Sequence, residues 1–295
     1  MVTKASTSEK IFTGFNYAFL TFLSVLCILP MINVLAVSFS DGWAAEGGMV
    51  KLWPIGFNID SYEYIVSDGK FIKAFMVSLQ RLVLGLAVTM TLTVLAGYPL
   101  SKGLDKFRSR ERYVWFFLIT MMFNGGLIPT YLVVQRAGLT NTLWALILPQ
   151  AIPVFNVILL QNFFKALPKE IEESAFMDGA GHVRTLVSLY LPLSKPVLAT
   201  LTLFVAVHHW NSWFDGLIFI NSPAKYPLQS YLQTVVVNPD FDMLSAQELE
   251  NLWAGVVAKN SKAATIFLAA APIIMLYPFL QKYFIKGIVL GSVKG

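Results

Sequence analysis

Glu173-Ser174-Ala175-Phe176-Met177-Asp178-Gly179-Ala180 lies between two long apolar runs, and the chain continues through Gly181 to Leu189-Tyr190-Leu191-Pro192. Pro168 precedes this stretch and suits the beginning of a helix. Acidic residues follow it, where negative charge favours a helix N-terminus. Gly179 and Gly181 allow a sharp bend, and apolar residues then recur at helical spacing up to Pro192. The stretch therefore predicts two short helices in an L-shaped, amphipathic element at a membrane surface.

The spacing of this stretch is Glu-Ser-Ala, three residues, Gly, nine residues and Leu-x-Leu-Pro. It resembles the EAA loop of binding-protein-dependent ABC importer permeases, with Ser174 and Leu189 standing where that motif has Ala and Ile. The Asp-Gly-Ala continuation is similar to the carbohydrate branch of that family. An ordinary amphipathic hairpin at the membrane interface is the alternative. The resemblance implies an ATPase-coupling surface formed by Glu173, Ser174, Ala175, Asp178, Gly179 and Ala180.

The composition is that of an integral membrane protein. Of the 295 residues, 56% are hydrophobic and only 13% are charged, whereas soluble domains carry about 25% charged residues. The net charge of +5 does not indicate nucleic-acid binding, because no basic patch alternates with exposed aromatic residues. Cys27 is the only cysteine and lies in the first apolar run, so a disulfide within the chain is excluded.

Six apolar stretches are long enough to cross the hydrocarbon core, which requires about 20 helical residues each. We therefore expect an all-α, polytopic membrane protein with one transmembrane domain over residues 1–295. A cytoplasmic two-helix loop, residues 165–196, is expected between the fourth and fifth spans. The expected spans cover residues 12–39, 72–100, 113–135, 142–164, 197–220 and 263–284.

Lysine and arginine set the expected orientation. With a cytoplasmic N-terminus, the inner segments hold about twice as many of these residues as the outer ones, as the positive-inside rule demands. We therefore expect a multi-pass protein of the cytoplasmic membrane with both termini inside. The loop containing Glu173 then lies in the cytoplasm, where an ATPase is able to meet it.

Polar and aromatic side chains lie inside the fifth expected span, where they are costly unless they face the interior of the bundle. A sugar offers hydroxyl groups for hydrogen bonds and flat C–H faces for aromatic rings. Interfacial anchoring and bonding between helices are the alternative roles for these residues. The Trp-Asn-x-Trp pattern is also similar to that of the carbohydrate permeases. We expect a translocation path at Trp210, Asn211, Trp213 and Asp215, with Arg81 from the second span.

Arg81 and Asp215 are each a lone charge in an apolar span, which is costly without a partner. Their expected depths differ by roughly 7 Å at 1.5 Å per helical residue, so we hypothesise an ion pair. The alternative is that each side chain reaches water or a polar cavity. No metal site is expected, because the adjacent His208 and His209 point about 100° apart on a helix and no His-Glu-x-x-His sequence occurs.

The chain is identified as a member of the carbohydrate ABC permeases, and the resemblance extends to the tail, residues 283–295. It implies alternating access and four kinds of partner: a second permease, two ATPases, an extracytoplasmic solute-binding protein and a sugar or oligosaccharide. No Walker A sequence occurs, so this chain is not expected to be an enzyme or to bind a cofactor. ATP and Mg²⁺ belong to the partner ATPases. The alternatives are a permease for a non-sugar solute, an ion-driven secondary carrier, and a membrane enzyme using His208 or His209.

Overall fold

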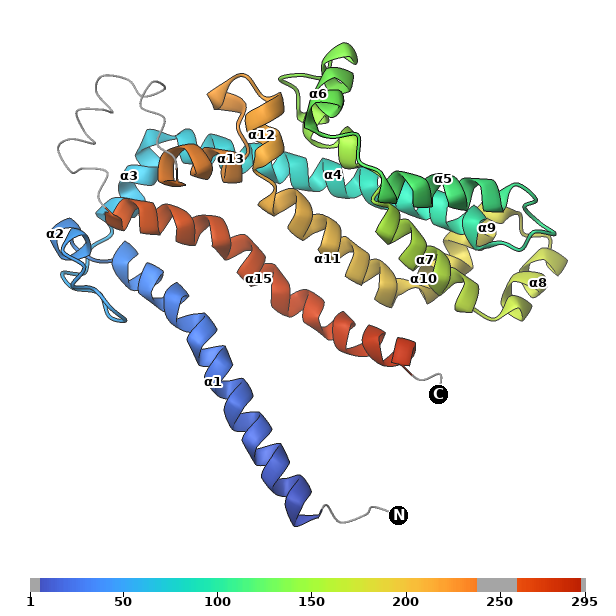
Figure 1. Ribbon diagram of the computed structural model, residues 1–295, viewed down its shortest axis with the longest axis horizontal. Helices are drawn as coiled ribbons and strands as arrows, with labels where there is room; N and C mark the ends of the chain where they lie inside the picture. Colours follow the sequence, from blue (N-terminus) through green and yellow to red (C-terminus); the bar gives the residue numbers. More distant parts are fainter. Residues whose placement is uncertain (1–5, 238–258, 293–295) are drawn as a thin grey trace. The chain divides into compact units, whose positions relative to one another are not determined.

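The computed structural model describes residues 6–237 and 259–292, and every regular element in these ranges is helical (Figure 1). The all-α class is therefore confirmed. Two compact units share the chain, with boundaries after Phe71, Gln233 and Ala271. The expectation of a single domain over residues 1–295 stays a prediction, and the last tail residues, 293–295, lie outside the described ranges.

The first unit contains three helices and the beginning of a long one. They are α1 (Thr7–Ser38), α2 (Gly42–Glu46), α3 (Asp60–Asp68) and the first part of α15 (Lys259–Ser292). The second unit contains the other elements and the remainder of α15. These elements are α4 (Lys70–Ser101), α5 (Arg110–Met122), α6 (Leu127–Arg136), η1 (Leu143–Leu146), η2 (Leu148–Gln150), α7 (Val154–Ala166), α8 (Lys169–Met177), α9 (His182–Thr185), η3 (Leu186–Tyr190), α10 (Leu191–Leu193), α11 (Lys195–Asn211), α12 (Phe214–Phe219), η4 (Pro223–Lys225) and α13 (Leu228–Leu232). The short element η5 (Gln233–Val237) begins at the boundary, and all of it after Gln233 belongs to the first unit.

The first unit packs around the C-terminal end of α1. Ala36 and Val37 lie in a small core with Ala44, Ala45 and Ala263, so short side chains let α2 and α15 approach α1 closely. Upstream, the side chains of α1 from residue 11 to residue 28 are mostly apolar around the helix, and all are exposed. A helix of this kind is suited to hydrocarbon rather than to water.

In the second unit α4 buries one narrow face. A side chain on Gly85 would meet His209 of α11 at 2.6 Å, and one on Gly97 would meet Leu160 of α7 at 3.4 Å. Helices in membranes associate through such small residues, because small residues let the backbones approach. α4, α7 and α11 therefore lie side by side (Figure 1). The buried positions of α4 recur every three or four residues and include Ser78, Arg81, Gly85, Thr89, Thr93 and Gly97.

The core of this unit is aromatic at the end where α4 finishes. The rings of Tyr98, Phe164 and Tyr190 meet edge to face, with centroids 5.1 to 6.4 Å apart. Leu160 and Leu201 extend the same core into α7 and α11. Edge-to-face pairs add to the stability that burial provides, and this core fixes the loop after α7 against the end of α4.

Glycine and proline lie at the breaks in two of the expected spans. The third expected span is broken at Gly125-Gly126, where α5 and α6 meet at 118° and Gly126 has a φ of +89°. Residues 143–150 and α7 meet at 50°, next to Pro149 and Pro153. In the fifth expected span, α11 ends at Asn211 and a second helix, α12, begins at Phe214.

By length and composition, α1 and α4 are each able to cross a membrane. Three bent pairs bring the possible number to five among the residues that the structure describes. α15 covers the sixth expected span with 34 residues. The polytopic class is therefore confirmed, and the count of six stays a prediction.

Candidate functional site

The expected coupling loop is built from α8 and the short helices that follow it. α8 ends at Met177, and Gly179 then adopts a φ of +78°, which is the left-handed region that glycine enters without strain. The segment from His182 to Leu193 follows and meets α11 at 84°. Two helical segments therefore lie between residues 165 and 196, and Gly179 and Gly181 separate them. The L shape of this element stays a prediction.

The predicted coupling residues divide between two sides of this element. Glu173, Ser174 and Asp178 are exposed on α8 and at its end. Ala175 is only 8% exposed and packs inward, so its small size serves the packing of α8 within the chain. Gly179 is exposed and Ala180 half-buried. A Cβ on Gly179 would have open space around it, so glycine is required there by its backbone conformation alone.

Three apolar side chains on the loop are strongly exposed. Met177 is 88% exposed, Val183 76% and Val187 55%. They lie on either side of the bend, close in sequence to the exposed carboxylates of Glu173 and Asp178. An exposed apolar group rimmed by charges is typical of a surface that another protein covers.

The inner side of α8 is held by a buried ion pair. Glu172 accepts a hydrogen bond from the Lys102 ammonium at 2.8 Å, and both side chains are less than a tenth exposed. The Tyr190 hydroxyl accepts from Lys102 and donates to Glu172, each at 3.0 Å. The Lys102 ammonium also lies 3.9 Å from the ring centre of Tyr98 and 4.1 Å from that of Tyr190. We call Tyr98, Lys102, Glu172 and Tyr190 the cation cage.

The cation cage shifts the titration of both charged groups. Burial alone would raise the pKa of Glu172, but its bonds to Lys102 and Tyr190 and the charge of Lys106 hold that pKa below its ordinary value. Burial lowers the pKa of Lys102, and the attraction of Glu172 offsets this only in part. The pair thus stabilises the carboxylate without fully compensating the burial of the ammonium, as is general for buried ion pairs.

A second group of contacts lies beside the cage. The Lys106 ammonium lies 3.6 Å from Glu172 and 5.1 Å from the ring centre of Phe176. The ring of His182 packs against Phe176, and its Nδ1 lies 3.4 Å from the Tyr98 hydroxyl. The segment after α4 and the two arms of the loop therefore contact one another through charged and aromatic side chains.

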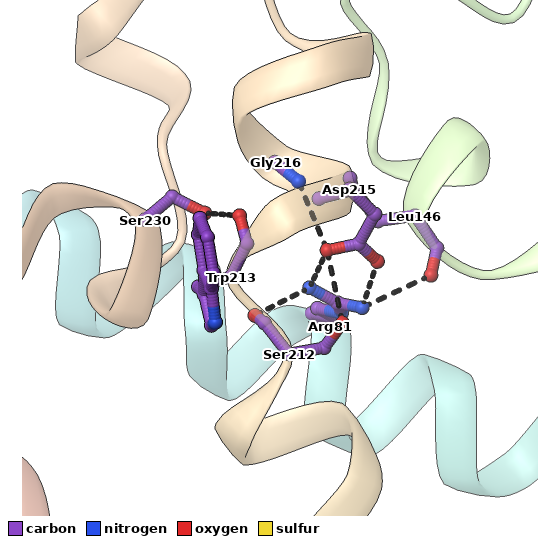
Figure 2. A network of polar contacts seen from close by, with 7 residues as sticks. All are labelled: Arg81, Leu146, Ser212, Trp213, Asp215, Gly216 and Ser230. Atoms are coloured by element: carbon purple, nitrogen blue, oxygen red, sulfur yellow. Dashed lines mark hydrogen bonds and ion pairs between the residues drawn. The ribbon is translucent and has the colours of Figure 1, made fainter. Parts of the chain in front are cut away.

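The hypothesised pair of Arg81 and Asp215 is present in the structure (Figure 2). The guanidinium binds the carboxylate through both Nη atoms, with Nη1 donating to Oδ1 at 3.2 Å. Arg81 is fully buried and Asp215 is 8% exposed. Two-point binding of this kind is the strong form of an arginine–carboxylate contact, so neither side chain depends on reaching water.

Neighbouring groups complete this network. Arg81 donates to the carbonyl oxygens of Ser212 at 3.2 Å and Leu146 at 3.4 Å. Asp215 accepts from the Ser212 hydroxyl at 3.0 Å and from the Gly216 N–H at 2.9 Å. The network joins α4, the η1 turn and the break between α11 and α12 (Figure 2), which makes that break a fixed part of the fold.

The other expected path residues have different environments. Trp210 is 2% exposed, and its ring meets that of Phe75 edge to face with centroids 5.7 Å apart. Asn211 is exposed and Trp213 is 40% exposed. The described residues contain no group of three His, Cys, Asp or Glu side chains that would hold a metal ion.

Sequence reasoning missed the cation cage. Glu172 is among the acidic residues that follow Pro168, and Lys102 is among the cations counted on the inner segments, but nothing in the sequence pattern pairs them. The edge-to-face rings of Tyr98 and Tyr190 come from segments about ninety positions apart. The one available signal was the helical period of α8. It places Glu172 and Glu173 about 100° apart around the helix, so only one of them is expected on the exposed face.

The chain matches the family described as "Binding-protein-dependent transport system inner membrane component" over residues 112–289. It is 41% identical to Protein LplC of Bacillus subtilis, covering 97% of this chain and 96% of that protein. It is 38% identical to the polygalacturonan/rhamnogalacturonan transport system permease protein YtcP of the same organism, covering 97% and 99%.

A solved structure is also similar, from a bacterial ABC transporter involved in the import of the acidic polysaccharide alginate. Its matching chain is 30% identical, with a TM-score of 0.87 over 96% of this chain and 100% of that one. The matched permeases are transport components of membranes rather than enzymes. The chain belongs to the family of binding-protein-dependent transport system inner membrane components, and it is similar to permeases of carbohydrate ABC transporters.

Proposed function

We propose that this chain is one transmembrane subunit of an ATP-driven importer for an oligosaccharide, and that it couples to separate ATPase subunits through residues 165–196. The observation that carries the proposal is the two-sided geometry of α8. Its inner side is fixed to the chain by Glu172, while Glu173, Ser174 and Met177 point outward and are exposed. A fixed element with an exposed outer face is suited to dock on a partner and to pass on its motion.

The chemistry of the exposed face favours a partner with an apolar groove and a basic rim. Met177 and Val183 supply apolar surface, and Glu173 supplies a carboxylate beside it. Charge complementarity at a rim fixes the register of two proteins, while buried apolar groups supply most of the affinity. The cytoplasmic location of this loop and of both termini rests on the distribution of Lys and Arg.

The network around Asp215 argues against a carrier driven by an ion gradient. Such a carrier needs an ionisable group inside the membrane that binds and releases its ion. Asp215 instead holds Arg81 through both Nη atoms and accepts two further hydrogen bonds. Its bonding capacity is used within the fold, so alternating access powered by the ATPases is the better account.

The printed names of the relatives support a proposal for the substrate class. YtcP is named for polygalacturonan and rhamnogalacturonan and the alginate importer for an acidic polysaccharide, whereas MdxG of Bacillus subtilis, 28% identical, is named for maltodextrin. We propose an oligosaccharide containing uronic acid. Arg81 is already neutralised by Asp215, so it does not supply the charge that would bind a uronate.

The test is uptake by the whole complex in proteoliposomes, with both permeases, the ATPases and the binding protein. Trigalacturonate, an alginate trisaccharide and maltotriose are the probes. ATP-dependent uptake of an acidic probe supports the proposal. Uptake of maltotriose and of neither acidic probe would contradict the uronate-containing substrate and indicate a neutral oligosaccharide instead. ATP-independent uptake driven by an ion gradient would overturn the importer itself.

Coupling through the loop is tested in the same system with Glu173→Lys and Gly179→Asp. Reversing a charge at a docking surface weakens binding by about tenfold or more, so stimulated ATP hydrolysis and uptake fall together. Glu111→Lys reverses a carboxylate that is also exposed, at the start of α5, and serves as the matched control. Full activity of both loop variants would remove the loop from the coupling path.

A further inference from the structure

We infer that the cation cage is the link that makes the coupling element and the end of α4 move as one body, and that Lys102, Glu172 and Tyr190 are positioning residues for transport. The inference rests on the proposed function and assigns a role to residues inside the coupling element. Its basis is the buried contact among three elements, not the exposed docking face.

The cage joins segments that are far apart in the chain. Lys102 directly follows α4, Glu172 lies on α8, and Tyr190 ends η3, the turn that leads through α10 into α11. The Lys102 ammonium contacts α8, η3 and α4. It lies 2.8 Å from Glu172 of α8, 3.0 Å from the Tyr190 hydroxyl of η3 and 3.9 Å from the ring centre of Tyr98 of α4. A displacement of α8 therefore reaches α4 and the start of α11 through the same atom.

The bonds in the cage are satisfied in a way that fixes its geometry. The Tyr190 hydroxyl has one proton, which it donates to Glu172, and a lone pair that accepts from Lys102. Each of the three groups thus bonds the other two. Hydrogen bonds to charged groups are stronger than neutral ones, and a closed triangle of them resists sliding or rotation of α8 more than an apolar contact does.

Burial makes separation of Lys102 from Glu172 unfavourable. Lys102 is 6% and Glu172 6% exposed, so parting the two side chains would leave a charge in a poorly solvated site. Small separations are therefore opposed, and the elements are expected to shift together when the ATPases close. The neighbouring Glu173 is exposed and takes no part in the cage, which offers a matched control one position away.

The experiment measures the distance between α8 and the segment after α4 in the complete transporter. Spin labels replace Glu170 and Asp105, both exposed, in a Cys27→Ser background, and distances are recorded without nucleotide and with ATP under non-hydrolysing conditions. In the otherwise unchanged chain we expect one narrow distribution that ATP leaves unchanged. With Glu172→Gln we expect the distribution to broaden or shift on ATP binding, and with Glu173→Gln to stay narrow.

Two further variants separate positioning from folding. Lys102→Met with Glu172→Met removes both charges together, so no unpaired charge is buried and assembly is retained, yet the distribution should broaden on ATP binding. Lys102→Arg keeps a cation between the rings and should preserve the narrow distribution. An assembled Glu172→Gln or double variant with a narrow, nucleotide-independent distance overturns the inference.

Transport gives the second readout. For the trisaccharide that the complex imports, Glu172→Gln should lower the number of molecules imported per ATP hydrolysed by about fivefold or more, while ATP hydrolysis continues. Glu173→Gln should lower hydrolysis and uptake together and leave their ratio unchanged. Failure of the unchanged complex to import any probe counts against the proposed function, whereas the distance measurement decides the role of the cage without a sugar.

Discussion

Glu172 and Glu173 are neighbours in the chain and face different sides of α8, one buried and one exposed. Glu172 is 6% exposed and bonded to Lys102 at 2.8 Å, while Glu173 is exposed to solvent. Successive residues of a helix point about 100° apart, so one turn of α8 both fixes the helix to its own chain and leaves a carboxylate exposed, which is the group that the proposed coupling would present to a partner. The two residues are expected to respond differently to the same substitution.

The pH dependence of stability should single out Glu172. Its pKa in the folded chain lies below the ordinary value of 4.5, so its carboxylate contributes stability that is complete above pH 4.5 and is lost as the pH falls through the lowered value. The Tm of the purified complex should therefore be lower for Glu172→Gln than for the unchanged chain near neutral pH. That difference should shrink as the pH is taken below 4.5.

Glu173→Gln is the control for removing one carboxylate from α8, and it should change Tm little at any pH. A Tm difference for Glu172→Gln that stays constant from neutral to acidic pH would show that its carboxylate does not stabilise the fold through its charge.

The Arg81–Asp215 pair should behave as a unit. Removing one member of a buried pair costs about 3 to 5 kcal/mol, because the other charge stays buried, whereas replacing both by apolar residues is often nearly neutral. We expect Arg81→Met and Asp215→Leu each to lower the Tm and yield of the complex, and the double variant to recover most of the loss. Simple additivity in the double-mutant cycle would contradict the coupling seen in the structure.

Gly179 should be sensitive to backbone conformation rather than to side-chain volume. Its φ is +78° and a Cβ would meet nothing, so Gly179→Ala is expected to cost about 1 kcal/mol of stability. Gly179→Asn should cost less, since asparagine tolerates this conformation. Gly181 has a φ of −77°, and Gly181→Ala is the control with no expected loss. Equal Tm values for all three variants would count against the left-handed turn.

Topology can be tested by labelling single cysteines from outside intact cells in a Cys27→Ser background. Ala224 is exposed and lies on a segment expected outside, whereas Ser174 is exposed on the coupling loop. We expect Ala224→Cys to be labelled and Ser174→Cys to be protected until the cells are opened. Ser230 is unsuitable as an outside probe because it is fully buried and bonded to the Trp213 carbonyl. The reverse labelling pattern would invert the orientation.

The two tryptophans of the fifth span should separate transport from folding. Trp210 is 2% exposed and packs on Phe75, so Trp210→Ala should cost about 3 to 5 kcal/mol and reduce the assembled complex. Trp213→Ala and Asn211→Ala change exposed residues and should lower uptake with assembly intact. Normal uptake by both of the latter variants would place the sugar contacts on the partner permease.

The sequence by itself determined the class and the family. Long apolar runs with few charges require helices that cross a membrane, because only helices satisfy their own backbone groups there. The spacing around Gly179 located the turn between two short helical segments, and glycine adopts the left-handed conformation that this turn has. The rise of a helix was enough to bring Arg81 and Asp215 to similar depths, so their pairing was also predictable.

Only the tertiary structure decided which charges are buried and which face outward. Glu172 and Glu173 are identical in type and adjacent, and their roles differ because the end of α4 covers one side of α8. Trp210 and Trp213 differ for the same reason, since the first packs on Phe75 and the second lies beyond the end of α11. Composition and periodicity give the faces of a helix, but the element that covers each face comes from contacts between residues far apart in the chain.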